Sequence, residues 1–213
     1  MLEIHGASAS PFVRKVRVAL AEKGIPYTLV PVVPFGVSPE FLRMSPLGKI
    51  PVLKDGDYTL PDSSCIVAYL ERVQPEPALA PRDPKQFGRA LFLEEYADTR
   101  VVETLGPVFF ERFVKVRLMN GKADEARCRE QIDVKAPPVF DWLEAQAPDG
   151  DGIVGGRFSL ADIAVASPFV NYRHVGERVD ARRWPRLAAY LERVWSRPSF
   201  KGVIEEETKE YGL

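Results

Sequence analysis

The chain has few of the residues that support metal, disulfide or membrane chemistry. Its 213 residues include two cysteines and two histidines, and no apolar run approaches the roughly 18 residues of a membrane-spanning helix. Cys65 and Cys128 stand far apart, and His5 and His174 are isolated, so no metal-ligand spacing is present. The segment 1–10 lacks the basic and apolar regions of a secretion signal. We therefore expect no metal, two reduced thiols and a cytoplasmic location.

An excess of charge of either sign is also missing. Lys and Arg total 29 and Asp and Glu total 30, so the formal net charge is −1. This balance gives no reason to expect nucleic acid or a membrane as a partner. Hydrophobic residues make up 46% of the chain, which is ordinary for a globular protein with a buried core.

Short β-rich runs alternate with helical patterns in the first 80 residues. The expected elements are a strand at 1–6, a helix from Pro11 that Gly24 ends, a strand at 27–32, a short helix at 38–45, a hairpin at 51–60 and a helix from about Asp62. This order, βαβ followed by ββα, predicts a small α/β domain.

A proline-rich segment, residues 74–84, follows this α/β region and is unsuited to a helix interior. We place the domain boundary there, with one domain at 1–77, a linker at 78–84 and a second domain at 85–213. Strand signals are almost absent from the second domain, which we expect to be all-helical. Its expected helices are a long one over 85–119 that bends near Gly106-Pro107, one from about Ala123 that kinks or breaks at Pro137-Pro138, one opened by a capping box of Ser159 and Asp162, and one after Pro185.

Four local motifs occur in this framework in a fixed order. They are "SPFVRKVR" (10–17), "SPLGKIPVL" (45–53), "LPDSSCI" (60–66) and "FSLADI" (158–163). In this order and spacing the chain resembles the glutathione S-transferase family over nearly its whole length. The resemblance implies a thioredoxin-like N-terminal domain with a mixed four-stranded sheet, an all-α C-terminal domain and a homodimer. It also implies glutathione as a co-substrate, with no cofactor.

Ser10 is the residue that we expect to carry the chemistry. The resemblance places the family's activating residue here, and a serine hydroxyl can donate a hydrogen bond to a bound thiol and favour its thiolate. The start of the helix at Pro11 adds a favourable potential. The alternative is that Ser10 only caps this helix, since serine before proline is a common helix start. Ser8 is the second candidate hydroxyl, with a structural loop role as its alternative.

The remaining glutathione contacts are implied by the resemblance. A cis bond between Ile50 and Pro51 would direct the Ile50 backbone toward the cysteinyl backbone of glutathione; the alternative is a trans proline that starts a strand. Asp62 and Ser63 would bind the ammonium and carboxylate of the γ-glutamyl end, although both residue types also favour a helix start. Lys49 would meet the glycyl carboxylate or remain a solvated lysine. Phe12, beside Ser10, completes the expected glutathione-binding set.

A second, apolar substrate needs a pocket of its own. We expect it to be walled by Phe12, Tyr96, Arg100 and Phe109, with core packing as the alternative for each. The cations Arg14, Lys15 and Arg17 are expected on a solvated helix face, and Cys65 is expected to pack in the interior.

These expectations combine into one function and two rivals. The first is conjugation of the glutathione thiolate to a small hydrophobic electrophile, with Ser10 as hydrogen-bond donor. A glutathione-dependent isomerase or dehalogenase needs the same thiolate and a different pocket. A non-catalytic scaffold that binds other proteins is the alternative of another class, and it would be free to lose the glutathione contacts.

Overall fold

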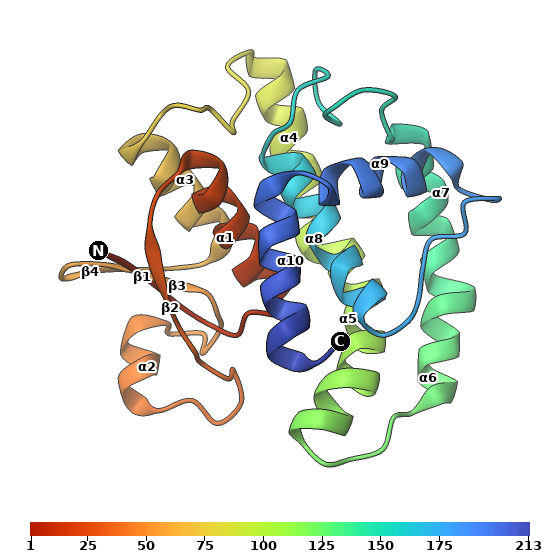
Figure 1. Cartoon of the computed structure of the whole chain (residues 1–213), viewed down its shortest axis with the longest axis horizontal. Helices are drawn as coiled ribbons and strands as arrows, with labels where there is room; N and C mark the ends of the chain where they lie inside the picture. Colours follow the sequence, from red (N-terminus) through yellow and green to blue (C-terminus); the bar gives the residue numbers. More distant parts are fainter. The chain divides into compact units, whose positions relative to one another are not determined.

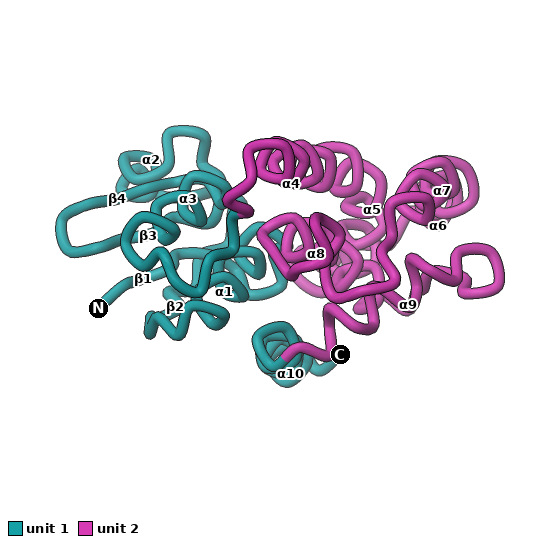
Figure 2. Tube along the Cα trace, turned by 90° about the horizontal axis from the view of Figure 1, so that it is seen from above, with its two compact units in different colours: residues 1–80, 198–213 teal, residues 81–197 magenta.

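The computed structural model describes all residues, 1–213, and divides into two compact units. The first comprises Met1–Ala80 together with Pro198–Leu213, and the second comprises Pro81–Arg197 (Figure 2). The boundary at Ala80 falls in the proline-rich segment. The C-terminal residues differ from the expected division, because they belong to the first unit and not to the helical one.

The first unit contains a mixed four-stranded sheet. Its elements are β1 (Leu2–His5), α1 (Pro11–Lys23), β2 (Tyr27–Val30), α2 (Pro39–Met44), β3 (Val52–Asp55), β4 (Tyr58–Pro61), α3 (Ser63–Val73) and α10 (Pro198–Tyr211) (Figure 1). The strand order is β2-β1-β3-β4, with β1 and β2 parallel and the other pairs antiparallel. This arrangement confirms the predicted thioredoxin-like sheet and the βαβ-ββα order.

Helix α1 forms as its sequence predicts, and its N-terminus follows the carboxyl end of β1, a central strand of the sheet. Ser10 is the N-cap, Pro11 occupies the first turn, and Gly24 ends the helix with φ of 64°, a conformation that glycine adopts without strain. Val13 and Val16 are fully buried on the side of α1 that packs on the sheet. The first turn of α1 is therefore held rigidly after β1.

The second unit is all-helical, as expected. Its α-helices are α4 (Pro84–Tyr96), α5 (Val102–Phe109), α6 (Glu125–Glu130), α7 (Ala136–Gln146), α8 (Leu160–His174) and α9 (Pro185–Trp195), and π-helical turns lie at Ala97–Val101, Phe110–Leu118 and Gln131–Lys135. The stretch expected as one long helix, 85–119, is thus helical as far as Leu118, and its backbone hydrogen bonds alternate between the α and π patterns. At Pro137-Pro138 the helix does not break: the prolines stand in the first turn of α7, where no N–H is needed, directly after a π-helical turn.

The capping box at the start of α8 is present and buried. Asp162 is 0% exposed, and its carboxylate accepts hydrogen bonds from the Ser159 N–H at 2.8 Å, the Ile153 N–H at 2.8 Å and the Tyr190 hydroxyl at 2.8 Å. Burial raises the pKa of the Asp162 carboxyl, and its donors lower it. The box ties α8 to the preceding loop and to α9.

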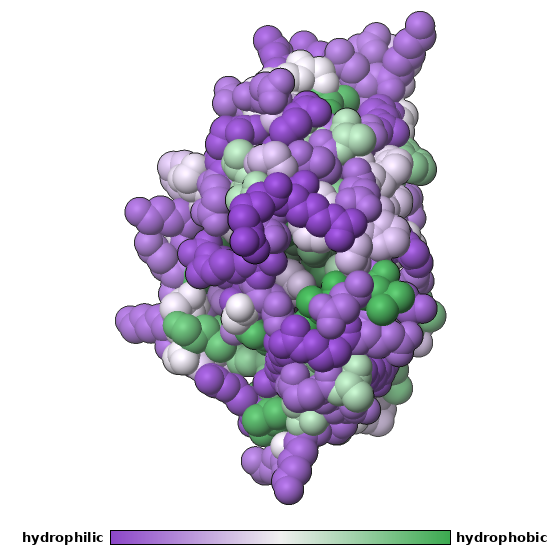
Figure 3. All heavy atoms as spheres, turned by 90° about the vertical axis from the view of Figure 1, so that its right-hand side faces the viewer, coloured by the Kyte–Doolittle hydropathy of each residue, from purple (hydrophilic) through white to green (hydrophobic).

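The outer surface is mixed in character. Hydrophilic residues cover most of the face drawn in Figure 3, and hydrophobic residues form small groups between them. None of the helices has the length and apolar character needed to cross a membrane.

Candidate functional site

Ser10 lies at the end of a tight turn in the loop between β1 and α1. The Ser10 N–H donates to the Ala7 carbonyl at 3.0 Å, so Ser8 and Ala9 are the two central residues of a β-turn. Gly6 precedes it, and a Cβ at that position would lie 2.4 Å from a methyl group of Val13. Because residue 6 is a glycine, the loop can pass close to the Val13 side chain of α1.

Ser10 combines a capping role with an unused proton. Its Oγ accepts a long hydrogen bond, 3.4 Å, from the Val13 N–H, and the residue is half-buried. Because the hydroxyl accepts in this contact, its own proton is left to donate. The side chain also lies at the positive end of the α1 dipole. The geometry is suited to stabilising an anionic sulfur.

Ser8, the second candidate, is placed differently. It is 2% exposed, and its Oγ lies 2.6 Å from Glu210 Oε2 and 3.0 Å from the Tyr211 hydroxyl, both at the end of α10. A hydroxyl has one proton, which here goes to the carboxylate. Ser8 is therefore engaged within the protein, whereas the Ser10 proton is not.

The segment before β3 carries the second predicted contact. The Ile50-Pro51 bond is cis, as the resemblance implies, and Ile50 lies just outside the strand. Ser45 is 1% exposed and stabilises this loop. Its Oγ accepts from the Lys49 N–H at 3.1 Å and donates to the Lys49 carbonyl at 2.7 Å. The Lys49 side chain itself is exposed.

Asp62 and Ser63 form the start of α3 in a strained conformation. Asp62 has φ of 79° and ψ of 129°, and its Oδ1 accepts from the N–H groups of Ser64 at 2.9 Å and Cys65 at 3.1 Å. Such an aspartate is an outlier of the kind that concentrates at functional sites. Ser63 is 3% exposed, and its hydroxyl has no hydrogen-bond partner in the chain. Both side chains thus keep polar capacity for a ligand.

Two expectations about this unit are wrong. Arg14, Lys15 and Arg17 do not lie on a solvated face: they are 0%, 1% and 2% exposed. Cys65 does not pack in the interior, because it is exposed in the first turn of α3. Arg14 and Arg17 are buried because α10, a helix that the local sequence pattern did not predict, covers their side of α1 (Figure 1), whereas Lys15 donates to Ser64 Oγ of α3 at 3.0 Å.

The acidic residues of α10 supply the partners of Arg14 and Arg17. Glu207 is 0% exposed and accepts from Arg14 Nε at 2.9 Å and Arg14 Nη2 at 2.6 Å, and Glu206 pairs with Arg17. The signal in the sequence is the run of three glutamates at 205–207, in a helix that begins at Pro198. With Glu210 these glutamates are four acidic residues on one helix, which complement the charge of Arg14 and Arg17 on α1.

The residues expected to wall a second-substrate pocket occur in both units. Phe12 is half-buried at the start of α1 in the first unit. In the second unit, the tilted rings of Tyr96 and Trp142 have centroids 4.2 Å apart, Phe109 stacks on Phe113 at 4.8 Å, and Arg100 is exposed. Burial raises the pKa of the Tyr96 hydroxyl. Their role in binding a second substrate stays a prediction.

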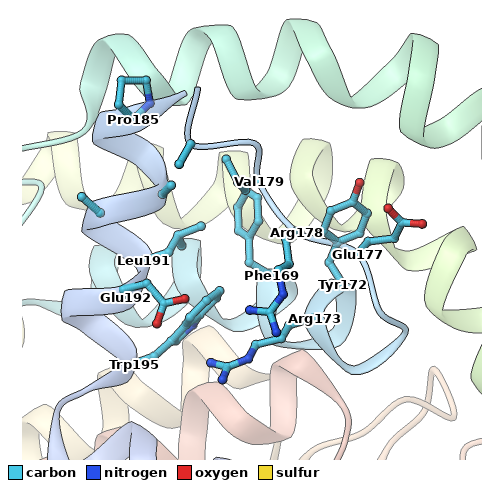
Figure 4. Close-up of a pocket in the computed structure, with 13 residues that line it drawn as sticks. Phe169, Tyr172, Arg173, Glu177, Arg178, Val179, Pro185, Leu191, Glu192 and Trp195 are labelled. Carbon is cyan, nitrogen blue, oxygen red and sulfur yellow. The ribbon is translucent and has the colours of Figure 1, made fainter. Parts of the chain in front are cut away.

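The second unit also contains a pocket of about 370 Å³ between α8, α9 and the loop that joins them (Figure 4). Its apolar wall includes Phe169 and Trp195, and the Arg173 guanidinium lies 5.5 Å from the Trp195 ring. Glu177, also at this pocket, is already paired with Arg112 at 2.7 Å. None of the predicted site residues lines it.

The fold and the Ser10 region define a thioredoxin-like domain, with a serine at the start of its first helix, joined to a helical domain. Residues 4–78 match the family described as the N-terminal domain of glutathione S-transferase, and residues 126–193 match its C-terminal domain. The chain belongs to the glutathione S-transferase family.

Individual relatives cover nearly all of the chain. A glutathione S-transferase of Pseudomonas putida is 42% identical over 211 residues, covering 97% of this chain and 93% of the relative. FtsZ-localized protein A of Caulobacter vibrioides is 26% identical over 208 residues, covering 95% and 90%. The crystal structure of a glutathione S-transferase from Rhodospirillum rubrum is 27% identical with a TM-score of 0.86, covering 95% and 91%.

Proposed function

We propose that the protein is a glutathione transferase in which Ser10 stabilises the glutathione thiolate for attack on a small hydrophobic electrophile. The observation that carries this proposal is the Ser10 hydroxyl, which accepts at the N-terminus of α1 and keeps its proton for a ligand. Family membership supports glutathione as the thiol.

The Ser10 hydroxyl and the N-terminus of α1 can supply the free energy needed to stabilise the thiolate. A thiol of pKa about 8.5 is about 3% ionised at pH 7, and lowering its pKa by about 2 units makes it about three-quarters thiolate, a change worth about 2.7 kcal/mol. One hydrogen bond to a charged group contributes about 1.5–3 kcal/mol and a helix N-terminus about 0.3–1 kcal/mol. The two together are sufficient, and no general base is needed at the sulfur.

The reaction then balances without a cofactor. The thiol proton leaves to solvent on binding, and the sulfur lone pair forms a carbon–sulfur bond with the electrophile. A leaving group such as halide departs with its bonding pair, and an addition substrate instead takes up a proton. Ser10 forms no covalent bond at any stage.

The other expected contacts orient glutathione. The Ile50 backbone pairs with the cysteinyl residue, Asp62 accepts from the γ-glutamyl ammonium, and Ser63 donates to its carboxylate. Asp62 can do this with its second oxygen while Oδ1 continues to cap α3. The exposed Lys49 ammonium is available to the glycyl carboxylate, and Phe12 packs beside the thiol.

The finer parts of the proposal concern the electrophile and the assembly. We propose that Phe12, Tyr96, Arg100 and Phe109 bind the electrophile, and that the protein is a cytoplasmic homodimer. An isomerase or dehalogenase uses the same thiolate but releases glutathione or an altered thiol product, so mass analysis of the products separates these reactions from stable conjugation.

A protein-interaction scaffold is the second candidate, and the similarity to FtsZ-localized protein A favours it. A scaffold has no need to ionise a thiol. The unpartnered Ser63 hydroxyl and the free Ser10 proton support the enzyme over the scaffold.

The test is calorimetric titration with glutathione, with thiolate absorbance followed against pH. Ser10→Ala is compared with Ser38→Ala, because Ser38 caps α2 in the same way, accepting from Phe41 N–H at 3.2 Å before a proline. We expect both variants to lose about 1 kcal/mol of stability, and only Ser10→Ala to raise the thiol pKa, by about 1–2 units, because the helix N-terminus remains. Absence of glutathione binding by the wild type would refute the proposed function, and an unchanged pKa in Ser10→Ala would refute the role of Ser10.

A further inference from the structure

The end of α10 lies against the turn that precedes Ser10. This helix belongs to the first unit although it begins at Pro198, and it lies beyond residues 126–193, which match the family's C-terminal domain. Helices α10 and α1 pack against each other (Figure 1). The contact therefore joins the two ends of the chain inside one compact unit.

A buried ion pair sets the register of α10 on α1. Arg14 and Glu207 are both 0% exposed, and two guanidinium nitrogens contact the carboxylate at 2.6 to 3.1 Å. A two-point contact of this kind fixes orientation as well as distance. Because Glu207 cannot slide along the helix face without leaving a buried charge unpaired, the residues one turn further along α10 are placed with the same accuracy.

Those residues are Glu210 and Tyr211, and they contact the two central residues of the β-turn. Glu210 accepts the Ser8 proton at 2.6 Å, and the Tyr211 hydroxyl lies 3.0 Å from Ser8 Oγ and accepts from the Ala9 N–H. Burial raises the pKa of Tyr211, so it stays protonated in the working range of the protein. Both polar groups of the turn tip are thus held by α10.

The turn continues directly into the helix cap. Its closing hydrogen bond runs from the Ser10 N–H to Ala7, and the Ser10 carbonyl then accepts from the Arg14 N–H at 2.9 Å, the first bond of α1. A rotation of the Ser8–Ala9 peptide would turn the Ser10 backbone and with it the direction of Oγ. We propose that Glu210 and Tyr211 are positioning residues that hold this turn and so aim the Ser10 hydroxyl at the thiol sulfur.

The proposal rests on the proposed function of Ser10 and predicts a specific effect on ionisation. With the turn released, Ser10 still caps α1, but its proton is aimed at the sulfur for a smaller fraction of the time. We expect the double variant Glu210→Gln/Tyr211→Phe to raise the pKa of bound glutathione by about one unit and to lower the thiolate population about tenfold at low pH. At a pH well below the pKa of the bound thiol, binding of glutathione should change less than twofold, since no contact to its ends is altered.

The experiment measures the thiolate absorbance of bound glutathione against pH and kcat and KM with a chlorodinitrobenzene as the electrophile. The matched control is Glu205→Gln, the same charge change on α10 at a residue whose only ion pair is an exposed one with Lys201 at 3.8 Å. At this low pH we expect the control to match the wild type, and the double variant to lose kcat with an unchanged KM for glutathione. Ser8→Ala removes the other side of the contact and should reproduce the effect, with no further loss when it is combined with Glu210→Gln.

The outcomes separate the two claims. If the wild type neither binds glutathione nor ionises it, the proposed function fails. If the wild type ionises it and the double variant shows the same thiol pKa and kcat, the positioning role alone is overturned. A loss of kcat in Glu205→Gln of equal size, or additive losses in Ser8→Ala and Glu210→Gln, also overturns it. Circular dichroism and the thermal midpoint are recorded for each variant, and Tyr211→Phe alone, which removes one oxygen atom, serves if the double variant does not fold.

Discussion

Glu207→Leu is expected to be among the most destabilising single substitutions in the first unit. The change removes the two carboxylate oxygens that accept from Arg14 Nε and Nη2, so the buried guanidinium, 0% exposed, loses its ion-pair partner. Breaking a buried ion pair in this way costs about 3–5 kcal/mol. For a chain of this length each kcal/mol lowers the melting temperature by about 2–4 °C, so the midpoint should fall by about 10 °C. Urea unfolding and calorimetry both measure this loss.

The companion experiment removes the other charge as well. In Arg14→Met/Glu207→Leu no buried charge remains, and two hydrocarbon side chains of similar size fill the space, so the stability should return to within about 1 kcal/mol of the wild type or exceed it. Glu205→Gln, in the exposed pair on the same helix, should change stability by less than about 0.5 kcal/mol. A single variant as stable as the wild type would show that the pair is not desolvated. A double variant as unstable as the single one would assign the loss to packing.

Two further predictions concern the helical unit. Asp162→Ala leaves several buried donors without an acceptor and should lower the free energy of unfolding by about 4 kcal/mol. Asp83→Ala, at an exposed helix cap, should lower it by about 1 kcal/mol. Comparable losses in urea unfolding would contradict the buried capping box. Gly152→Ala places a Cβ 1.9 Å from the Arg157 carbonyl and should cost about 3 kcal/mol or more. Gly88→Ala, in α4 with open space around it, should instead stabilise by about 1 kcal/mol, and thermal melts of the two variants test this opposite sign.

Elements with local signals were predictable from the sequence. Ser10 before Pro11 and Gly24 after Lys23 mark the two ends of α1 because caps are local: the hydrogen bonds run to residues within four positions. The same holds for the capping box of Ser159 and Asp162. These features depend on a few neighbouring residues, so the sequence pattern is sufficient to predict them.

Burial of the cations on α1 was not predictable in this way. Arg14 meets a partner 193 positions away, and nothing in the neighbourhood of residue 14 indicates that a second helix will cover it. On local pattern alone, charged residues at this spacing indicate a solvated face. The C-terminal run of glutamates carries the complementary signal, but it becomes informative only when the two helices are known to be adjacent.

The contact with α10 adds to the choice between the two serines. The resemblance and the position before Pro11 favour Ser10 over Ser8, but the sequence does not show what either hydroxyl contacts. In the structure the Ser8 hydroxyl donates its proton to Glu210 of α10, whereas the Ser10 hydroxyl only accepts a hydrogen bond. The positive φ of Asp62 is likewise invisible in the sequence, because aspartate at a helix start ordinarily has extended backbone geometry.

The expected glutathione contacts and the residues that hold the Ser10 turn all belong to the same compact unit, yet that unit is built from both ends of the chain. Ser10, Ile50 and Asp62 come from the first 80 residues, whereas the carboxylates that pair with Arg14 and Arg17 come from α10. A fragment that ends at Ala80 would expose the side of α1 that carries Arg14 and Arg17 and leave Arg14 without Glu207. The helical unit that lies between the two segments in sequence must therefore be synthesised before the Ser10 site can reach its final geometry.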